Sequence, residues 1–336
     1  AYPMCEGLVG SEMCISDSAT APKRQSINLD KDQTYRFEVE YFFEGRFPAI
    51  QFGCKPPEAV DLLQEAKKAA QAADAVILVI GTNSDWETEG NDRADLGLPA
   101  NQDELVDAVL AENKNTVVVI NSGSPVSMPW ESQSKAILQS WFGGQEYGNA
   151  LMDILFGEVN PSGKLPTTFP KRIEDTPAFS CYPGENSQMD YEEKLLVGHR
   201  WYERKNIKSL FPFGHGLSYT DFSYGDLEIS VSGNADVVCR FNIENIGDMD
   251  GQEVAQCYVS YESSPSDEPI KSLQSFKKVL IEKQKKQEIE IHLNARNFSY
   301  WDVKDKDWKI RPGSYSIEIG SSSEKIELSE RINLGN

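Results

Sequence analysis

The chain has 336 residues, and its 33 basic and 53 acidic side chains leave a net charge of −20. A content of 39% hydrophobic and 10% aromatic residues indicates folded domains, and the length suits two domains at the usual ~150 residues each. The charge argues against nucleic acids and anionic membrane surfaces as partners, because both repel an acidic protein. It fits a neutral ligand such as a sugar.

The sequence shows no pattern of a membrane span, a metal site or a cofactor site. Its longest apolar run, residues 75–80, is much shorter than the ~18 residues of a membrane helix. The start has neither a signal-peptide pattern nor an initiator Met, which favours a processed product or a fragment. Six cysteines without a Cys-x-x-Cys pair and three scattered histidines argue against zinc. Cys5 with Cys14, and Cys239 with Cys257, are each compatible with a disulfide and with free buried thiols.

The first segment, residues 1–56, has an all-β pattern. Residues 35–43 alternate apolar and charged side chains, and residues 49–53 make a second short strand. Two or three strands do not form a stable sheet alone. We therefore expect this segment to complete a β domain whose first strands are missing from the chain.

From residue 57 to about 210 the pattern changes to helices that alternate with apolar strands. The expected elements are helices at 58–73, 102–112 and 145–156, and strands at 75–80, 116–120 and 136–139. Apolar strands alternating with helices of about ten residues predict an α/β layer with a mainly parallel sheet. The continuous apolar runs predict that the first two strands are fully buried.

The last segment, residues 211–336, is expected to hold a linker and then a β-sandwich. Its short alternating runs, separated by turn residues, are 237–244, 253–260, 288–293 and 314–320. Several short strands at such spacing predict a sandwich of ~100 residues.

The loop after the first apolar strand, residues 81–93, is the first place to look for a site. Ligands of open parallel sheets bind beyond the carboxyl ends of the strands. The loop carries the ionisable residues Asp85, Glu87, Glu89, Asp92 and Arg93. A carboxyl group held near Trp86 and other carboxylates has a raised pKa and can act as a general acid, and Gly90 lets the backbone turn sharply beside Glu89. The same acids also fit a solvated loop in which one pairs with Arg93 and one caps the next helix.

Other motifs carry less weight. Residues 143–148 lack the G-x-G-x-x-G spacing of a dinucleotide site, and residues 121–125 do not form the G-x-S-x-G turn of a hydrolase. Residues 297–299 form a glycosylation sequon, which has meaning only in a secreted protein. Packing is a commoner role than sugar binding for four further tryptophans, Trp141, Trp201, Trp301 and Trp308.

A series of motifs runs in one order across residues 57–320. They are D-W-E-T-E-G-N-D-R (85–93), L-G-L-P-A-N-Q (96–102), N-S-G-S-P-V (121–126), W-F-G-G-Q-E-Y-G-N-A (141–150), G-E-V-N-P-S-G-K-L-P-T-T-F-P (157–170), V-G-H-R-W-Y-E (197–203), F-P-F-G-H-G-L-S-Y-T-D-F (211–222), G-Q-E-V-A-Q-C-Y-V (251–259), F-S-Y-W-D (298–302) and P-G-S-Y (312–315). Together these segments resemble glycoside hydrolase family 3, and most of all its β-glucosidases with an inserted PA14 domain.

The resemblance implies a domain organisation. Residues 1–56 are similar to the last strands of a PA14 domain, residues 57–210 to the family's α/β-sandwich domain, and residues 211–336 to a linker and a fibronectin type III-like domain. The family's N-terminal barrel, which carries the nucleophilic aspartate, is absent from these residues.

The resemblance also implies an activity, the retaining hydrolysis of terminal β-D-glucosyl residues from oligosaccharides or aryl glucosides. Glu89 matches the acid/base glutamate of the family's E-G-x-D-R motif, with Glu87 as the runner-up. Asp85 and Trp86 are expected to shape the aglycone side of the pocket, and Arg93 to orient the loop. Ser84-Asp85-Trp86 is similar to the sequence around the family's nucleophile, but its context on the sandwich domain is wrong for that role.

Two classes of function remain open at this stage. The chain is either the C-terminal part of such an enzyme, which needs a barrel domain as its partner, or a non-catalytic carbohydrate-binding or scaffolding protein derived from that half. No cofactor and no metal is expected in either case. A homo-oligomer is compatible with both, and secretion is favoured over the cytoplasm.

Overall fold

The computed structural model describes residues 61–335 except 91, 185, 187 and 234, and before them residues 2–3, 28–29, 33–36 and 38. The strands predicted at 49–53 and over most of 35–43 lie outside the described residues, as do Cys5 and Cys14. The chain forms two compact units. The first takes residues 1–94, 98–123 and 129–139, and the second takes residues 95–97, 124–128 and 140–336.

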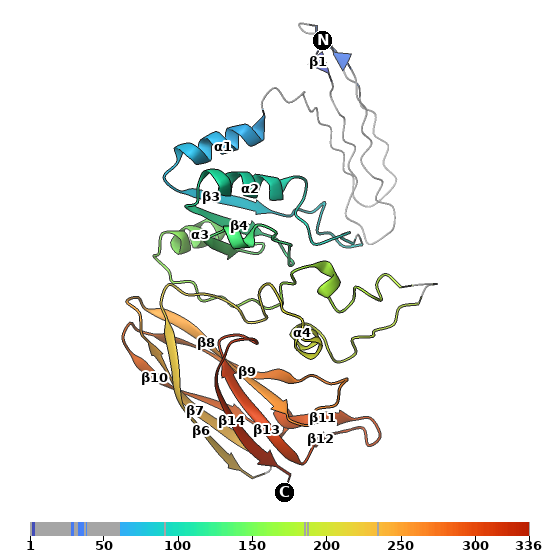
Figure 1. Ribbon diagram of the computed structural model, residues 1–336, viewed down its shortest axis with the longest axis vertical. Coiled ribbons are helices and arrows are strands. Elements are labelled where there is room, and N and C mark those ends of the chain that lie inside the picture. Colours follow the sequence, from blue (N-terminus) through green and yellow to red (C-terminus); the bar gives the residue numbers. More distant parts are fainter. Residues whose placement is uncertain are drawn as a thin grey trace. The chain divides into compact units, whose positions relative to one another are not determined.

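A three-stranded parallel sheet forms the centre of the first unit (Figure 1). Its strands are β3 (Val76–Gly81), β4 (Thr116–Asn121) and β5 (Ala136–Gln139), in the order β3-β4-β5. Val76 pairs with Thr116, and Val117 pairs with Ala136. The parallel sheet predicted from the apolar strands is therefore confirmed. A separate short pair, β1 (Tyr2–Pro3) with β2 (Asn28–Leu29), is antiparallel.

The helices α1 (Leu62–Ala72) and α2 (Gln102–Glu112) cover one face of this sheet (Figure 1). Helix α1 begins at Asp61, whose side chain accepts a hydrogen bond from the Gln64 amide and so satisfies a free donor of the first turn. The two helices are joined by Asn113, whose Nδ2 donates to the carbonyls of Ala70 and Ala73 at 3.0 and 2.7 Å. A short 3₁₀ helix, η1 (Glu131–Gln133), precedes β5.

Burial differs between the two long strands of the sheet. In β4, Val118, Val119 and Ile120 are completely buried, as predicted. In β3, however, Ile77 and Val79 are 48% and 54% exposed, so the prediction of a fully buried strand is wrong for this element. β3 is an edge strand of the described sheet, and alternate side chains of a strand point to opposite faces. Only one of the two faces is covered by α1 and α2.

The second unit begins with a long connecting region of little regular structure. It contains α3 (Tyr147–Leu155), the 3₁₀ helix η2 (Ile173–Asp175) and α4 (His199–Lys205). Helix α4 ends at Asn206, which adopts a left-handed conformation with φ of 53° and donates its amide to the carbonyls of Tyr202 and Glu203. Arg204 fixes this helix to the following domain, because its guanidinium donates to the carbonyls of Pro265 and Glu268.

Two antiparallel sheets form the rest of the second unit (Figure 1). The strands are β6 (Phe222–Ser232), β7 (Asp236–Asn245), β8 (Gly251–Tyr261), β9 (Lys271–Ile281), β10 (Lys286–Leu293), β13 (Gly313–Gly320) and β14 (Ile326–Leu334), with the hairpin β11 (Ser299–Asp302) and β12 (Asp307–Ile310) and the 3₁₀ helix η3 (Ala295–Phe298). The sheet orders are β10-β7-β6 and β14-β13-β8-β9. Apolar side chains of both sheets form one buried core, which confirms the predicted sandwich. Cys239 and Cys257 are free thiols in this core.

Candidate functional site

The loop predicted to carry the site starts where two neighbouring parallel strands end. Gly81 closes β3, and Asn121, its register partner, closes β4. The Thr82 amide then donates to the Asn121 carbonyl at 3.0 Å, which holds the two chain exits together. Any side chain at residue 81 would collide with this exit, since a Cβ there would lie 2.0 Å from the Asn121 carbonyl oxygen. The glycine is required for this close approach.

Gln102 fixes the same exit from the first turn of α2. Its Oε1 accepts the Gly81 amide proton at 2.8 Å, and its Nε2 donates to the carbonyls of Gly81 and Pro99 at 2.8 and 3.2 Å. One side-chain amide therefore replaces a strand partner on both backbone groups of Gly81. Because backbone groups that lose water need such partners, Gln102 sets where the loop leaves the sheet.

Glu87 is the carboxylate that the loop uses to hold itself. Its Oε1 accepts hydrogen bonds from the Thr82 hydroxyl at 2.6 Å and from the Gly123 amide at 3.2 Å. Thr82 is only 8% exposed, so the first of these bonds is sheltered from water. Glu87 thereby joins the loop after β3 to the loop after β4.

A tight turn at residues 83–87 lies between Thr82 and the later part of the loop. The amides of Trp86 and Glu87 both donate to the Asn83 carbonyl, at 3.0 and 2.9 Å, and the Asp85 amide donates to the Asn83 side chain at 3.1 Å. Asp85 is exposed on this turn, whereas Trp86 is half-buried. The turn thus brings Asp85, Trp86 and Glu87 together at the carboxyl ends of β3 and β4.

Glu89 lies farther along the loop and is exposed. Among the residues that the structure describes, none makes a hydrogen bond or an ion pair with its carboxylate. Gly90 beside it has a φ of 82°, which a residue with a side chain rarely adopts. Arg93 is half-buried at the end of the loop. Such an exposed, unengaged carboxylate can exchange a proton with a bound ligand or with water.

Three residues that support the loop were not predicted as part of the site. They are Thr82, Gln102 and Gly123, and they contribute a hydroxyl, a side-chain amide and a backbone amide. Gln102 ends the motif L-G-L-P-A-N-Q, which contributes to the family resemblance but predicts no role for this residue. A polar residue in the first turn of a helix that follows a glycine-ended strand was the available signal.

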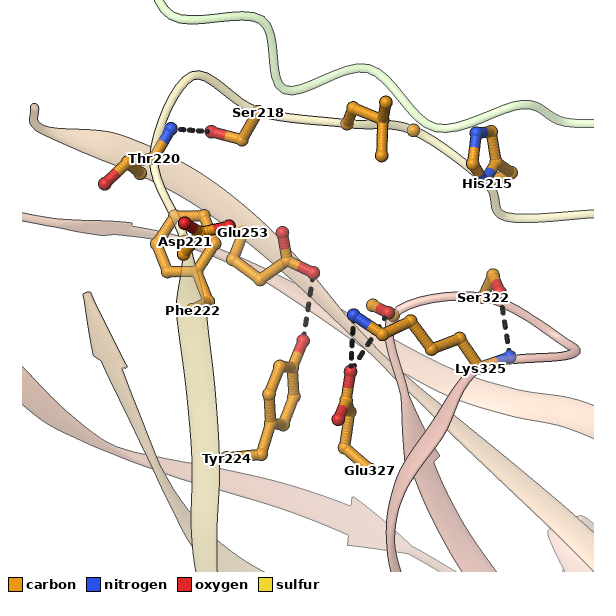
Figure 2. Close-up of a pocket in the computed structure, with 13 residues that line it drawn as sticks. His215, Ser218, Thr220, Asp221, Phe222, Tyr224, Glu253, Ser322, Lys325 and Glu327 are labelled. Carbon is orange, nitrogen blue, oxygen red and sulfur yellow. Dashed lines mark hydrogen bonds and ion pairs between the residues drawn. The ribbon is translucent and has the colours of Figure 1, made fainter. Parts of the chain in front are cut away.

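The second unit holds a small pocket of about 170 Å³ between the connecting segment and the sandwich (Figure 2). Figure 2 shows the Tyr224 hydroxyl directed at Glu253, to which it donates at 2.9 Å. The Nζ of Lys164 lies 3.2 Å from the same carboxylate, which is 4% exposed as a residue. Burial and the neighbouring carboxylate raise the pKa of Tyr224. Because these groups satisfy one another's hydrogen bonds and charge, the pocket has a structural role in holding the connecting segment on the sandwich.

A second cluster of buried charge lies where α4 packs on the sandwich, beside a hollow of about 500 Å³. Burial raises the pKa of Glu203 to about 7, while Lys271 opposes this rise and Glu318 adds to it. The Lys271 Nζ lies 3.2 Å from Glu318 and 3.9 Å from Glu203. Burial lowers the pKa of His199, on the same helix, to about 4, and the positive charge of Arg200 acts in the same direction.

The described residues contain neither a candidate membrane span nor a candidate metal site. No helix among them is both long and apolar enough to cross a membrane. No group of three or more histidine, cysteine, aspartate or glutamate side chains in that part of the chain is arranged to hold a metal ion.

Comparison with known proteins places the chain among glycoside hydrolases. Residues 16–219 match the family model described as the glycosyl hydrolase family 3 C-terminal domain, and residues 253–323 match that of a fibronectin type III-like domain. The thermostable β-glucosidase B of Acetivibrio thermocellus is 42% identical over 275 residues, which cover 81% of this chain and 36% of that protein. A β-glucosidase of Rhizobium radiobacter is 36% identical over 329 residues, which cover 94% of this chain and 40% of that protein.

Solved structures show the same likeness. The β-glucosidase of Bifidobacterium adolescentis matches with a TM-score of 0.79 and 39% identity, over 83% of this chain and 42% of that one. The β-glucosidase of Kluyveromyces marxianus in complex with glucose matches with a TM-score of 0.85 and 32% identity, over 100% of this chain and 43% of that one. The chain thus spans well under half the length of the relatives that it matches.

Proposed function

The chain belongs to glycoside hydrolase family 3, and from this premise we propose that it forms part of a retaining β-glucosidase. The proposed enzyme removes terminal β-D-glucosyl residues from oligosaccharides or aryl glucosides. The names of the relatives, all β-glucosidases, support this activity. A neutral substrate also suits a chain with a net charge of −20.

Glu89 is the proposed general acid and base. The observation that carries this choice is the contrast between two glutamates of one loop. Glu87 accepts one hydrogen bond from its own loop and one from the loop after β4, while Glu89 is exposed beside Gly90 and has no partner among the described residues. A proton donor has to reach the glycosidic oxygen, so the unengaged carboxylate is the better candidate.

The proposed reaction has two steps with one proton shuttle. In the first step Glu89 gives its proton to the departing glycosidic oxygen, while an aspartate of a barrel domain outside these residues attacks the anomeric carbon. In the second step Glu89 takes a proton from water, which then displaces the aspartate. In retaining enzymes the two carboxyl groups stand about 5–5.5 Å apart.

The other residues of the loop have supporting roles in this proposal. Asp85 and Trp86, which the turn at Asn83 presents together, bound the aglycone side of the substrate pocket. Glu87 keeps the loop in place through Thr82 and Gly123. Arg93 orients the end of the loop that carries Glu89.

The domain boundaries are part of the same proposal. Residues 57–210 form the α/β-sandwich domain of family 3, and residues 211–336 form the linker and the fibronectin type III-like domain. Residues 1–56 form the end of a PA14 domain inserted into the α/β sandwich. A barrel domain is the expected partner, because the proposed nucleophile belongs to it.

The acid/base role is tested by Glu89→Gln in the enzyme that contains this chain together with its barrel. Turnover of cellobiose, whose leaving group is a sugar alcohol that needs protonation, should fall by roughly 10²–10⁴-fold, whereas glucosylation of the enzyme by aryl glucosides with good leaving groups should change much less. Azide added to Glu89→Gly should restore the turnover of these aryl glucosides, because it replaces the attacking water, and the product should be β-glucosyl azide. Glu104→Gln is the control, because Glu104 is an exposed glutamate on α2 with no role in the proposal and its substitution should leave turnover unchanged. Unchanged cellobiose turnover in Glu89→Gln would remove Glu89 from this role.

A second assay uses the 336-residue chain alone. It should not hydrolyse p-nitrophenyl β-glucoside, because the proposed nucleophile lies outside it. Activity that Glu89→Gln abolishes would mean that a nucleophile is present after all, and the division of labour proposed above would be wrong.

A further inference from the structure

The hairpin of β11 and β12 carries two tryptophans side by side. Trp301 and Trp308 are register partners in this antiparallel pair. Side chains of directly opposed residues project from the same face of a hairpin, so both indoles lie on one side. Tyr300 and Lys309, the next partners, project from the other side.

The tryptophan side of the hairpin faces water. Trp301 is 45% exposed, Trp308 is 43% exposed, and Val303 in the connecting turn is 79% exposed. On the opposite side the ring of Tyr300 is covered by Arg311, whose guanidinium carbon lies 3.8 Å from the ring centre. The packing expected for Trp301 and Trp308 is partial, because they contact each other but both stay exposed. Adjacent exposed large apolar side chains are typical of an interaction surface.

The two indoles form a corner. Their ring centres are 5.3 Å apart and the ring planes differ by 59°. Arg296 covers the Trp308 ring, because its guanidinium carbon lies over this ring, 2.8 Å from the ring centre. The Trp301 indole therefore offers an apolar face to the C–H face of a sugar ring, and the guanidinium stacked on Trp308 offers N–H donors to its hydroxyl groups.

The charge of the hairpin favours a neutral ligand. Residues 299–310 contain three aspartates and three lysines, so the hairpin has no net charge in a chain of −20. These charges also hold one another, since the Lys309 Nζ lies 3.4 Å from Asp302 and also pairs with Asp305. With Arg296 the surface has one net positive charge, which is too little to hold a polyanion on a chain of −20.

We propose that Trp301, Trp308 and Arg296 form an accessory binding surface for a soluble β-glucan chain. One glucosyl ring lies on the Trp301 indole with its edge against the pair formed by Trp308 and Arg296, and Arg296 donates to its hydroxyl groups. A crystalline polysaccharide face would need coplanar rings, which the 59° angle excludes. The choice of a β-linked glucan rests on the proposed function, whereas the surface itself rests on the geometry of the hairpin.

Affinity electrophoresis of the 336-residue chain tests this surface without any catalysis. Gels with soluble mixed-linkage β-glucan should retard the chain relative to gels without polysaccharide. Trp301→Ala and Trp308→Ala should each weaken binding by roughly tenfold or more, as expected when a stacked aromatic anchor is lost. Phe276→Ala is the matched control, because Phe276 is 65% exposed on β9 of the same domain and should leave retardation unchanged.

The conservative variant Trp301→Phe separates a lost platform from a misfolded hairpin. It should keep part of the retardation, and its melting temperature should match that of Trp301→Ala. The proposal is overturned if the wild-type chain is not retarded, or if both tryptophan variants are retarded like wild type. It is also overturned if sedimentation shows a dimer that Trp301→Ala abolishes, because a second copy would then occupy the corner. None of these outcomes depends on whether the enzyme hydrolyses β-glucosides.

Discussion

The loop after β3 and the contact between α4 and the sandwich treat ionisable side chains in opposite ways. The loop leaves Asp85 and Glu89 exposed to water, while Glu87 accepts hydrogen bonds from the Thr82 hydroxyl and from the Gly123 amide of the loop after β4. The α4 contact encloses His199 and Glu203, of which the His199 Nε2 and both Glu203 carboxylate oxygens are buried without a hydrogen-bond partner among the described residues.

This difference shows that the buried ionisable residues and the proposed catalytic residue lie in different parts of the chain. A displaced pKa in a cleft is commonly taken as a pointer to a catalytic group. Here a glutamate with a pKa raised to about 7, Glu203, lies at a packing contact in the second unit. The glutamate that the family motif selects, Glu89, lies in an open loop of the first unit. Burial in this chain therefore indicates which charges the fold depends on, and it does not indicate the proposed acid/base residue.

Lys164→Ala should have the largest effect on stability, because it removes one partner of a buried ion pair. The side chains of Lys164 and Glu253 are 13% and 5% exposed, and Lys164 also donates to the Gly216 carbonyl at 3.0 Å. Its loss leaves the Glu253 carboxylate buried, with the Tyr224 hydroxyl as its one remaining donor among the described residues. Urea unfolding should show a loss of about 3–5 kcal/mol.

Lys68→Ala is the matched control from the first unit. Lys68 pairs with Glu65 at 2.8 Å on α1, but their side chains are 70% and 54% exposed. An exposed pair of this kind contributes only about 0.2–0.5 kcal/mol. Equal losses in the two variants would contradict the view that the second unit depends on its buried charges.

The second expected effect concerns the pH dependence of stability, to which Glu203 and His199 of α4 make opposite contributions. Glu203 has a folded pKa of about 7, above its ordinary value of 4.5, so its contribution to stability falls as the pH rises from 4.5 to 7. His199 has a folded pKa of about 4, below its ordinary value of 6.5, so its contribution falls as the pH drops from 6.5 to 4. Between pH 4.5 and 6.5 the two slopes oppose each other, because folding takes a proton from one residue and adds one to the other.

Substitution of either residue alone should reveal how stability depends on pH through the other. In Glu203→Gln, stability should fall steeply with acid below pH 6.5, and above pH 7 it should exceed that of wild type by on the order of 3 kcal/mol at most. In His199→Phe, stability should instead fall as the pH rises from 4.5 to 7. Thermal melts across pH 4–8 measure both. Parallel pH profiles for wild type and both variants would show that the two groups do not titrate as their burial implies.

Most of the fold was predictable because its central strands carry a strong pattern. The strands β7, β8 and β13 each lie between two neighbours, and the sequence predicted all three within two residues of their ends. The strands β6, β9 and β14, which lie at sheet edges, were missed, as was the two-stranded hairpin of β11 and β12. One edge strand of the sandwich, β10, was predicted within two residues of its ends. Edge strands accept polar side chains, as the lysines of β9 show, and this weakens the alternation on which prediction depends.

The site was predictable only in part. The motif at residues 85–93 identified the loop, and the match to family 3 confirms the resemblance on which that reading depended. The anchoring role of Glu87 could not be predicted, because its partner Gly123 is 36 residues away and the two meet only when β3 pairs with β4. Tertiary hydrogen bonds of this kind leave no local pattern in the sequence.

Gln102→Ala should have a smaller effect on stability than Lys164→Ala, but it tests how the proposed active loop is held. The substitution removes three hydrogen bonds and leaves the amide and carbonyl of Gly81 without their partner, which should cost about 1–3 kcal/mol. Gln133→Ala is the control, because its amide contacts only Asp107, at 3.0 Å, in an exposed position among the described residues. In the enzyme that includes the barrel, Gln102→Ala should also lower cellobiose turnover, since the exit of β3 sets where the loop with Glu89 begins. A variant that loses stability while turnover remains at the wild-type level would show that the loop takes its shape from elsewhere, and Thr82 and Glu87 would then be the next residues to change.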